Sequence, residues 1–216
     1  FFEIGLQNVN EFEMNLIENF FLNMGMSWTM SKLLPYAFTI LIGIVLIVPL
    51  RKFLKNRIRI VKWGAILILL LFPFAIYFIF NPIYEGDFSS QSFTVNKTSE
   101  YAELEDGKLI VLAIPNCPFC FEAIEKLKTL KKRIPNAKIE YIVCTSDTIN
   151  STSYVDWYQD EAGDALTVTL AENTSSLLKL ARHSFPTFVF VGEDLKSWSN
   201  DNFGVVALDE VEKLLK

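Results

Sequence analysis

The sequence predicts an α/β domain preceded by two membrane-spanning helices, and three observations favour this fold class. Two apolar runs without a charged residue, residues 34–50 and 63–80, lie in the first half of the chain. In the second half, strand-like and helix-like segments alternate, as they do where helices cover both faces of a mixed sheet. A Cys-x-x-Cys segment, residues 117–120, stands between one such strand and helix. This spacing suits reversible disulfide chemistry.

Each apolar run is close to the ~20 residues that a helix needs to cross a bilayer core. A buried core helix is the alternative for either run alone. The loop between them carries six basic residues and no acidic residue, which favours two membrane spans. We therefore assign residues 33–81 to two transmembrane helices joined by the basic loop 51–62. Pro73 is expected to kink the second helix, which membrane helices tolerate.

The distribution of charge sets the expected orientation. The positive-inside rule assigns the basic loop to the cytoplasm and both flanking segments to the outside. We therefore expect a two-pass protein in the lipid bilayer of the bacterial inner membrane, with the N-terminus and the α/β domain on the periplasmic side. From residue 82 onward, 21 acidic residues stand against 13 basic residues. This balance argues against nucleic acid as a partner.

Residues 1–32 form the expected extracytoplasmic N-terminal segment. Four apolar side chains within it recur at every fourth position, the spacing of an amphipathic helix: Phe12, Leu16, Phe20 and Met24. Such a helix can lie on the outer membrane surface or pack against another protein. Both possibilities stay open on the sequence.

The soluble part divides into a linker and one domain. Residues 82–100, rich in Ser, Thr and Asn, are interpreted as a linker or an irregular first strand, and residues 101–216 as the domain. Roughly 115 residues are enough for one hydrophobic core. Short apolar runs predict the strands 109–114, 138–146, 165–170, 185–191 and 195–199. Helical spacing and capping residues predict the helices 121–133, 152–161, 174–182 and a closing helix after Gly204.

The two thiols of the Cys-x-x-Cys segment have different expected roles. Cys117 falls at a helix N-terminus, where unpaired N–H groups and the helix dipole favour a thiolate. Cys120 lies about one turn further on and can close the ring on a mixed disulfide. We therefore expect Cys117 to be the nucleophile and Cys120 the resolving thiol. A purely structural bridge is disfavoured, because so short a loop removes little chain entropy.

A zinc site is the alternative use of these thiols. It would take a Cys₃His ligand set, namely Cys117, Cys120, Cys144 and His183. The spacing of these residues does not match compact zinc modules, and a cysteine in an apolar strand is usually core packing. We therefore expect no metal ion and no other cofactor. His183, the only histidine, is expected to cap the end of its helix.

The order of the elements around the dithiol resembles a thioredoxin fold, over about residues 100–216. The segment 147–172 is similar to the insertion of membrane-tethered, TlpA/ResA-type extracytoplasmic thioredoxins. This resemblance implies a three-layer α/β/α sandwich with thiol–disulfide oxidoreductase activity. The stretches LLKLARHSFPTFVFV and LKSWS also resemble thioredoxin-like domains fused to DoxX-type membrane helices in Bacteroidota. Those modules have four helices, whereas two are found in this chain.

The resemblance also implies further site residues. In that family a cis proline before the hairpin packs against the active-site disulfide, and Pro186 matches it. The residues expected to bind substrate flank these groups: Pro118, Phe119, Phe185 and Thr187.

The chain departs from the family pattern beside the dithiol. Asn116 stands where thioredoxins usually have Trp, and Val111 stands where they bury an acidic residue. Without that acid, proton transfer to the resolving thiol must use water or another group. The intervening Pro-Phe pair is closer to that of a glutaredoxin than to Gly-Pro. These differences leave the redox potential open.

The hypothesis from the sequence is a membrane-anchored thiol–disulfide oxidoreductase that reduces extracytoplasmic protein disulfides. Neither span contains a cysteine, so the helices cannot carry electrons across the bilayer by thiol exchange. A separate membrane electron-transfer protein is therefore expected as a partner, either a thiol reductant or a quinone-linked oxidant. The alternative hypothesis is a structural or regulatory subunit of a cell-envelope membrane complex, whose dithiol is not catalytic.

Overall fold

The computed structural model describes residues 15–53, 58–101, 104–147 and 149–216. These residues fall into two compact units, one within residues 14–85 and one within residues 86–216, which we call the helical unit and the sheet unit. Phe12, the first residue of the expected amphipathic repeat, lies outside the described residues, as do residues 54–57 of the basic loop.

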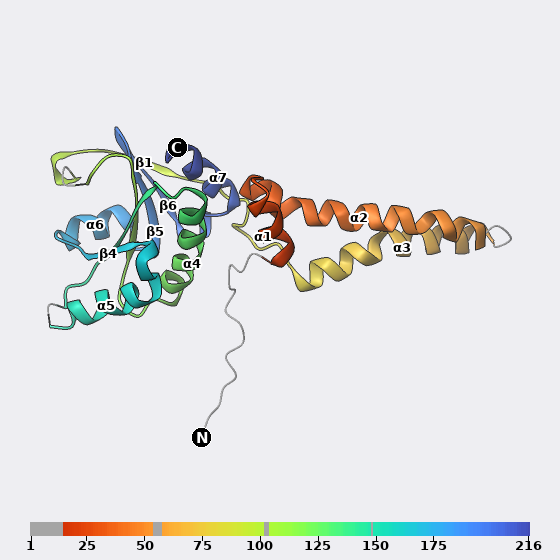
Figure 1. Ribbon diagram of the computed structural model, residues 1–216, viewed down its shortest axis with the longest axis horizontal. Helices are drawn as coiled ribbons and strands as arrows, with labels where there is room; N and C mark the ends of the chain where they lie inside the picture. Colours follow the sequence, from red (N-terminus) through yellow and green to blue (C-terminus); the bar gives the residue numbers. More distant parts are fainter. Residues whose placement is uncertain (1–14, 54–57, 102–103, 148) are drawn as a thin grey trace, which may run out of the picture. The chain divides into compact units, whose positions relative to one another are not determined.

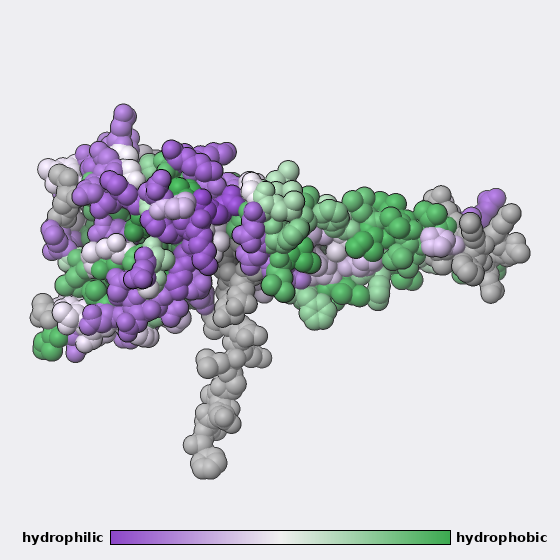
Figure 2. Space-filling view, viewed as in Figure 1, coloured by the Kyte–Doolittle hydropathy of each residue, from purple (hydrophilic) through white to green (hydrophobic). Residues whose placement is uncertain are grey.

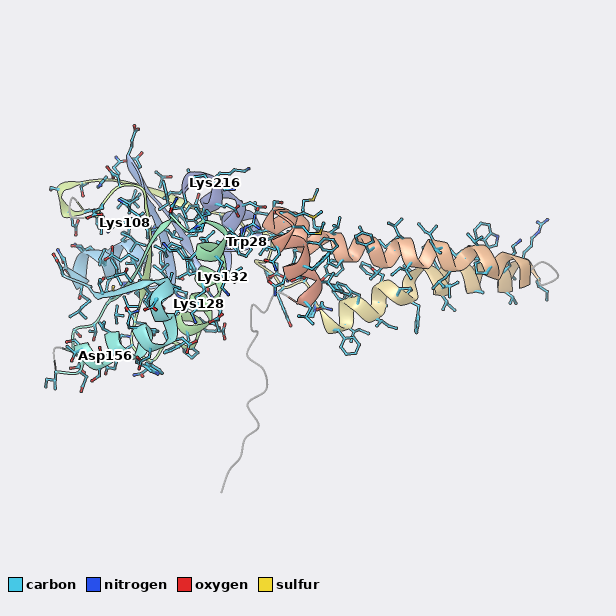
Figure 3. The ribbon with its side chains drawn as sticks, viewed as in Figure 1. Trp28, Lys108, Lys128, Lys132, Asp156 and Lys216 are labelled. Carbon is cyan, nitrogen blue, oxygen red and sulfur yellow. A yellow bond between two sulfur atoms is a disulfide. The ribbon has the colours of Figure 1, made fainter. Side chains whose placement is uncertain are left out.

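Three helices make up the helical unit: α1 (Leu16–Asn23), α2 (Trp28–Phe53) and α3 (Arg59–Phe80) (Figure 1). Two stretches of the long helices, Trp28–Pro49 and Arg59–Phe80, have the length and composition needed to cross a membrane. Hydrophobic residues cover α2 and α3 in Figure 2, whereas hydrophilic residues predominate over the sheet unit. Many side chains of the two helices project outward from the pair (Figure 3).

The first long helix begins earlier than the apolar run that predicted it. Residues 28–32, which we assigned to the N-terminal segment, are the first residues of α2. A charge-free run could not include Lys32, although lysine is a good helix former and the helix passes through it. Pro73 lies inside α3, which continues beyond it to Phe80.

The sheet unit is built on six strands in the order β1-β6-β5-β2-β3-β4. Their bounds are β1 (Phe93–Asn96), β2 (Lys108–Ala113), β3 (Lys138–Val143), β4 (Thr167–Leu170), β5 (Thr187–Val191) and β6 (Asp194–Ser199). The pairs β2–β3 and β3–β4 are parallel, whereas β5 runs antiparallel to β2 and β6, and β1 antiparallel to β6. Four helices follow or separate the strands: α4 (Pro118–Arg133), α5 (Ser151–Ala162), α6 (Thr174–Ala181) and α7 (Val205–Leu214).

Part of the expected linker 82–100 belongs to the sheet. Residues 93–96 form the edge strand β1, from the pair Phe93↔Ser197 to the pair Asn96↔Asp194. The strand is short and largely exposed, so it lacks the apolar pattern by which a strand is found in a sequence. Residue 87 is also tied to the domain, because the Asp87 carbonyl accepts a hydrogen bond of 2.7 Å from the Val205 N–H at the start of α7.

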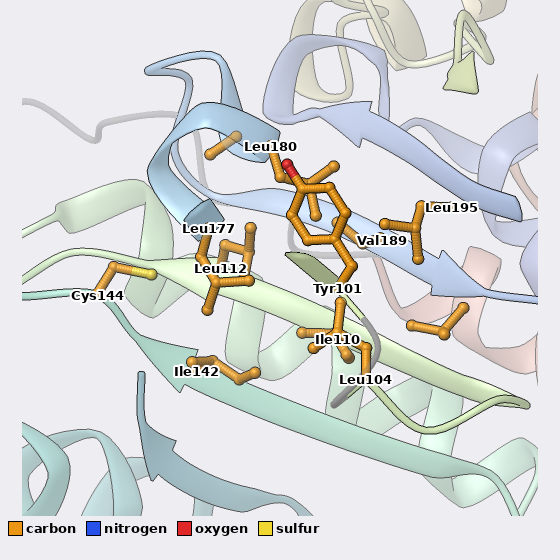
Figure 4. Close-up of a cluster of buried hydrophobic side chains, with 12 residues drawn as sticks. Tyr101, Leu104, Ile110, Leu112, Ile142, Cys144, Leu177, Leu180, Val189 and Leu195 are labelled. Atoms are coloured by element: carbon orange, nitrogen blue, oxygen red, sulfur yellow. The ribbon is translucent and has the colours of Figure 1, made fainter. Parts of the chain in front are cut away.

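One face of the sheet packs against α6 and the segment before β2 (Figure 4). Successive side chains of a strand point to opposite faces, so this cluster takes alternate residues of the central strands. Its buried members are Tyr101, Leu104, Ile110, Leu112, Ile142, Cys144, Leu177, Leu180, Ala181, Val189, Val191 and Leu195.

Strand residues of the opposite parity contact other helices. Val111 pairs in register with Tyr141 and with Phe188, and all three are fully buried. The Phe188 ring stacks on Phe203, just before α7, with 3.6 Å between centroids. Arg133, at the end of α4, forms an ion pair with Glu212 in α7 and donates two hydrogen bonds to its carboxylate, of 2.9 and 3.0 Å. Helices α4 and α7 are thereby held side by side.

The stacked phenylalanines predict a test of this core. Phe203→Ala removes a ring that is 1% exposed and should lower the free energy of unfolding by about 3–5 kcal/mol, because a cavity is left behind. Ile149→Ala, at a side chain that is 88% exposed, should change it by about 0.5 kcal/mol at most. Denaturant unfolding of the full chain in detergent, followed by tryptophan fluorescence, measures both. Equal losses would contradict the packing described.

Candidate functional site

The dithiol lies where the central strand β2 leads into α4. Cys117 and Cys120 are joined by a disulfide, with their Cα atoms 5.2 Å apart. Cys117 is the N-cap of α4, and its Sγ accepts a hydrogen bond of 3.2 Å from the Cys120 N–H. Pro118 takes the first helical position, where a missing N–H costs nothing. The sequence predicted this strand-to-helix placement, although it expected the helix to begin at residue 121.

The two sulfurs differ in their access to solvent. Cys117 is 7% exposed and Cys120 fully buried, whereas Pro118 and Phe119 between them are exposed. Both cysteines are thus buried, and Cys117 is the more exposed of the two, next to exposed apolar side chains. Dithiol exchange needs an attacking thiol that a substrate can reach, whereas the resolving thiol can lie deeper in the protein.

Asn116, directly before the dithiol, has a backbone conformation that explains its residue type. Its φ of 56° lies in the left-handed region, which asparagine adopts more readily than most residues. A tryptophan, the residue expected from the family pattern, would be strained in this conformation. The departure seen in the sequence thus has a local structural cause.

The β2–β5 pairing brings the Pro186 region to the dithiol end of the sheet. Leu112 pairs with Thr187, so the antiparallel register sets Pro186 opposite Ala113, the last residue of β2. The Phe185–Pro186 peptide bond is cis, and Pro186 is buried. Cys117 and Pro186, far apart in the sequence, thus lie at the same end of the sheet through strand register.

Two of the expected substrate-binding residues make internal contacts. The Thr187 hydroxyl donates to the Ser184 carbonyl, and its side chain is buried. Phe185 is partly buried and packs against the cluster beneath α6. Pro118 and Phe119 are the expected binding residues that are exposed beside the dithiol. A binding role for these four residues stays a prediction.

Two buried tyrosines hold the backbone on either side of the disulfide. The Tyr158 hydroxyl, from α5, donates to the Ile114 carbonyl at 2.8 Å, and the Tyr141 hydroxyl, from β3, donates to the Cys120 carbonyl at 2.7 Å. Both side chains are fully buried, and their ring centroids are 5.2 Å apart. The Tyr158 hydroxyl also has a hydrogen bond with the Cys117 backbone. The turn that carries the dithiol is therefore fixed at its start and at its end.

Burial keeps these hydroxyls protonated. It raises the pKa of Tyr158 to about 12, against the lowering effect of the hydrogen bond with the Cys117 backbone. It also raises the pKa of Tyr141 well above its usual value. Both groups are thus donors at neutral pH, and neither can serve as a base. The sequence analysis missed them, although a tyrosine inside an apolar strand such as KIEYIV needs a buried partner for its hydroxyl.

Helix α5 contacts the dithiol helix through an aromatic cluster. The Phe121 ring lies 4.1 Å from Trp157 and 4.6 Å from Tyr158, measured between centroids. Trp157 is 47% exposed, as is Phe119. Helix α5 therefore contributes both an internal support for the dithiol and an aromatic side chain on the surface of the domain.

The position of the family's buried acid holds a fully buried apolar side chain, Val111. Among the described residues of the sheet unit, the buried carboxylate is Glu212, which pairs with Arg133 at the opposite end of α4 from Cys117. Proton transfer at Cys120 therefore has no buried carboxylate beside it in the described part of this unit.

Cys144 and His183, the other members of the alternative zinc ligand set, lie apart from each other in burial: one is buried and the other exposed. Cys144 is buried in the cluster beneath α6, and burial raises its thiol pKa to about 12. His183 is exposed and follows Arg182, the residue that ends α6. Within residues 15–53, 58–101, 104–147 and 149–216, no group of three or more His, Cys, Asp or Glu side chains could hold a metal ion.

Comparison with known proteins gave one described likeness. No protein-family model matches the chain, and no curated protein does. A solved structure of a secreted Mycobacterium tuberculosis disulfide oxidoreductase, homologous to E. coli DsbE, is 18% identical and covers 51% of this chain and 81% of its own. The TM-score is 0.38. The function of the chain is inferred instead from strand order, register and the geometry of the dithiol.

The hydrogen bonds of Tyr158 predict a loss of stability. Tyr158→Phe leaves the buried Ile114 carbonyl without its donor and should lower the free energy of unfolding by about 1–3 kcal/mol. Tyr154→Phe is the matched control on the same helix, because its hydroxyl meets Asp147 only at 3.4 Å. Its effect should stay within about 0.5 kcal/mol. Denaturant unfolding of the oxidised full chain measures both, and a harmless Tyr158→Phe would refute the support assigned to this hydroxyl.

The raised pKa of Cys144 predicts unequal thiol reactivity. After reduction of the disulfide, iodoacetamide at mildly alkaline pH should modify Cys117 and leave Cys144 unmodified, because only thiolates react and Cys144 ionises near pH 12. Mass spectrometry of the native and the denatured protein locates the modified residues. Cys144 should react only after denaturation, and its modification in the folded protein would show that it is not enclosed as described.

Proposed function

We propose that the chain is a membrane-anchored thiol–disulfide oxidoreductase that reduces protein disulfides outside the cytoplasm. One observation carries this proposal: a disulfide between Cys117 and Cys120 at the start of α4, in which the N-cap cysteine is the more exposed of the two. A bridge across two residues adds little to stability, so its position at a helix N-terminus favours a chemical role.

The fold supports the same proposal. Strands β2, β3 and β4 are parallel and β5 and β6 form an antiparallel hairpin, as the thioredoxin-like resemblance implies. Helix α6 contacts one face of the sheet, whereas α4 and α7 contact strand residues of opposite parity, through Tyr141 and Lys196 respectively. From these contacts we infer a thioredoxin-like three-layer α/β/α sandwich.

The first chemical step uses the reduced dithiol. The Cys117 thiolate attacks one sulfur of a substrate disulfide, forms a mixed disulfide and releases the other substrate sulfur as a thiolate, which takes a proton from water. The helix N-terminus and the Cys120 N–H, 3.2 Å from the Cys117 sulfur, favour the anionic nucleophile. Exposed Pro118 and Phe119 border the sulfur and offer an apolar contact surface for the substrate.

The second step releases the product. Cys120 loses its proton and attacks the Cys117 sulfur, which breaks the mixed disulfide and frees the second substrate thiolate. Two electrons have then passed to the substrate, and the Cys117–Cys120 disulfide remains. The protonated hydroxyls of Tyr141 and Tyr158 cannot accept the Cys120 proton. Water at the Cys117 side is the acceptor that we propose.

The helical unit supports anchoring in a membrane. Its long helices are apolar, and no described residue of α3 is buried. The oxidised dithiol must be reduced again after each turnover, so we propose a membrane protein with its own dithiol as the electron donor. The basic loop favours an inner-membrane location with the sheet unit in the periplasm.

A trapping experiment tests the proposal. Cys120→Ser should accumulate mixed disulfides between Cys117 and extracytoplasmic proteins, because the resolving thiol is missing. The adducts should disappear on reduction and in a variant that also carries Cys117→Ser. Cys144→Ser in the trapping background should leave them unchanged, because that thiol is buried on the α6 side of the sheet. A trapping variant without adducts would favour the structural or regulatory subunit instead.

The redox state of the dithiol in cells tests the direction of electron flow. In cells, rapid acid quenching and thiol labelling of the wild-type protein should find Cys117 and Cys120 mainly reduced, as a reductase requires. A mainly oxidised pair whose reoxidation depends on quinone would identify an oxidase and overturn the proposed direction.

A further inference from the structure

Helix α1 has its polar and apolar sides in an unusual arrangement. Its charged residue, Glu18, is 1% exposed, whereas Leu16, Phe20 and Met24 are 90%, 60% and 62% exposed. These three residues are four apart, so they form one stripe along the helix. In a water-soluble protein an amphipathic helix buries its apolar side and exposes its polar side. In helix α1 the inward side holds Glu18 together with Leu22, which is 2% exposed, and the larger apolar surface faces outward.

The inward-facing polar groups of α1 are satisfied inside the helical unit. Asn15 caps α1, and its side-chain amide donates to the Tyr77 hydroxyl at 2.6 Å and to the Asn81 side chain at 2.9 Å. Tyr36 of α2 donates to the Asn81 carbonyl. These bonds hold α1 at the end of the helix pair where α3 terminates.

The buried carboxylate of Glu18 also finds its partners within the helical unit. It accepts a hydrogen bond of 3.3 Å from the Asn15 N–H, which completes a capping box, and lies 3.9 Å from the Lys32 ammonium in α2. The Lys32 and Glu18 side chains are 13% and 2% exposed. Enclosing an ion pair carries a desolvation cost, and the ionisable residues of membrane helices, which are rare, face the protein interior and pair in this way.

We propose that α1 is embedded at the outer boundary of the bilayer, with its stripe of Leu16, Phe20 and Met24 against lipid acyl chains. This inference rests on the membrane anchoring proposed above. Eight residues are far fewer than the ~20 needed to cross the bilayer core, so α1 lies at the boundary and does not span it. The membrane part of the chain would then have three lipid-contacting helices, of which two cross.

Two observations favour lipid over a protein partner as the occupant. The exposed apolar surface continues onto α2 and α3, where Leu41 and Ile68 are 53% and 67% exposed, so the same solvent would cover all three helices. The polar groups that a protein partner would use for specific recognition, Asn15 and Glu18, face inward. Helix α1 also contains no Lys or Arg, so contact with acyl chains, and not attraction to anionic headgroups, is the expected source of binding.

Photocrosslinking of the full chain in phosphatidylcholine vesicles tests this inference. A photoreactive benzoylphenylalanine is introduced separately at Phe20 in α1, at Ile68 in α3 and at Ile149 in the sheet unit, all exposed positions. After irradiation, mass spectrometry should find one added phospholipid on the variants at Phe20 and Ile68, and none on the variant at Ile149. The yield at Phe20 should be unchanged when anionic lipid is included, because α1 has no basic residue.

The results at the three positions distinguish a wrong placement of α1 from a wrong assignment of the membrane anchor. Lipid adducts at Ile68 without lipid adducts at Phe20 would overturn the placement of α1 and leave the membrane anchor standing. A protein adduct at Phe20, to a second copy or to another chain, would overturn it in favour of a protein partner. Absence of lipid adducts at Ile68 as well would overturn both this inference and the proposed anchoring.

Discussion

Strand β2 is the constraint on which the rest of the sheet unit depends. Both of its edges are paired, in parallel with β3 and antiparallel with β5, and its side chains after Lys108 are buried. Its end therefore fixes the start of α4 and the position of Cys117. The same pairing sets the register of β5 and so brings Pro186 opposite Ala113. A shift of the β2–β5 register by one residue would exchange the two faces of the sheet, which their different helical partners forbid.

The turn that carries the dithiol is held by buried neutral groups. Val111 stands at the position where thioredoxins bury an acidic residue, and two phenols kept protonated by burial touch the turn. They fix the carbonyls of Ile114 and Cys120 but supply no charge. The helix N-terminus is then the main electrostatic influence on Cys117, and water the route for protons. In the helical unit the polar side of α1 is likewise enclosed, which leaves contact with the surroundings to apolar side chains.

The sequence predicted the features that local patterns encode. Apolar runs located β2, β3 and β5, and the Cys-x-x-Cys spacing at a strand-to-helix boundary located the dithiol. Strand β1 was predicted only as an alternative to a linker, because its four residues are largely exposed and take their structure from pairing with β6. Tyr158 was missed because its partner, the Ile114 carbonyl, is 44 residues away in the chain. The burial of Glu18 in α1 was also invisible, since an amphipathic pattern does not tell which side faces inward.

A redox titration tests the central claim, reversible chemistry at the dithiol, most directly. The purified full chain is equilibrated with glutathione or dithiothreitol buffers of graded potential, quenched with a maleimide, and the modified cysteines are counted by mass. We expect one two-electron transition of Cys117 and Cys120, nearer to about −270 mV, typical of dithiol reductants, than to about −120 mV, typical of strong oxidants. A pair that stays fully oxidised or fully reduced across all buffers would contradict the account.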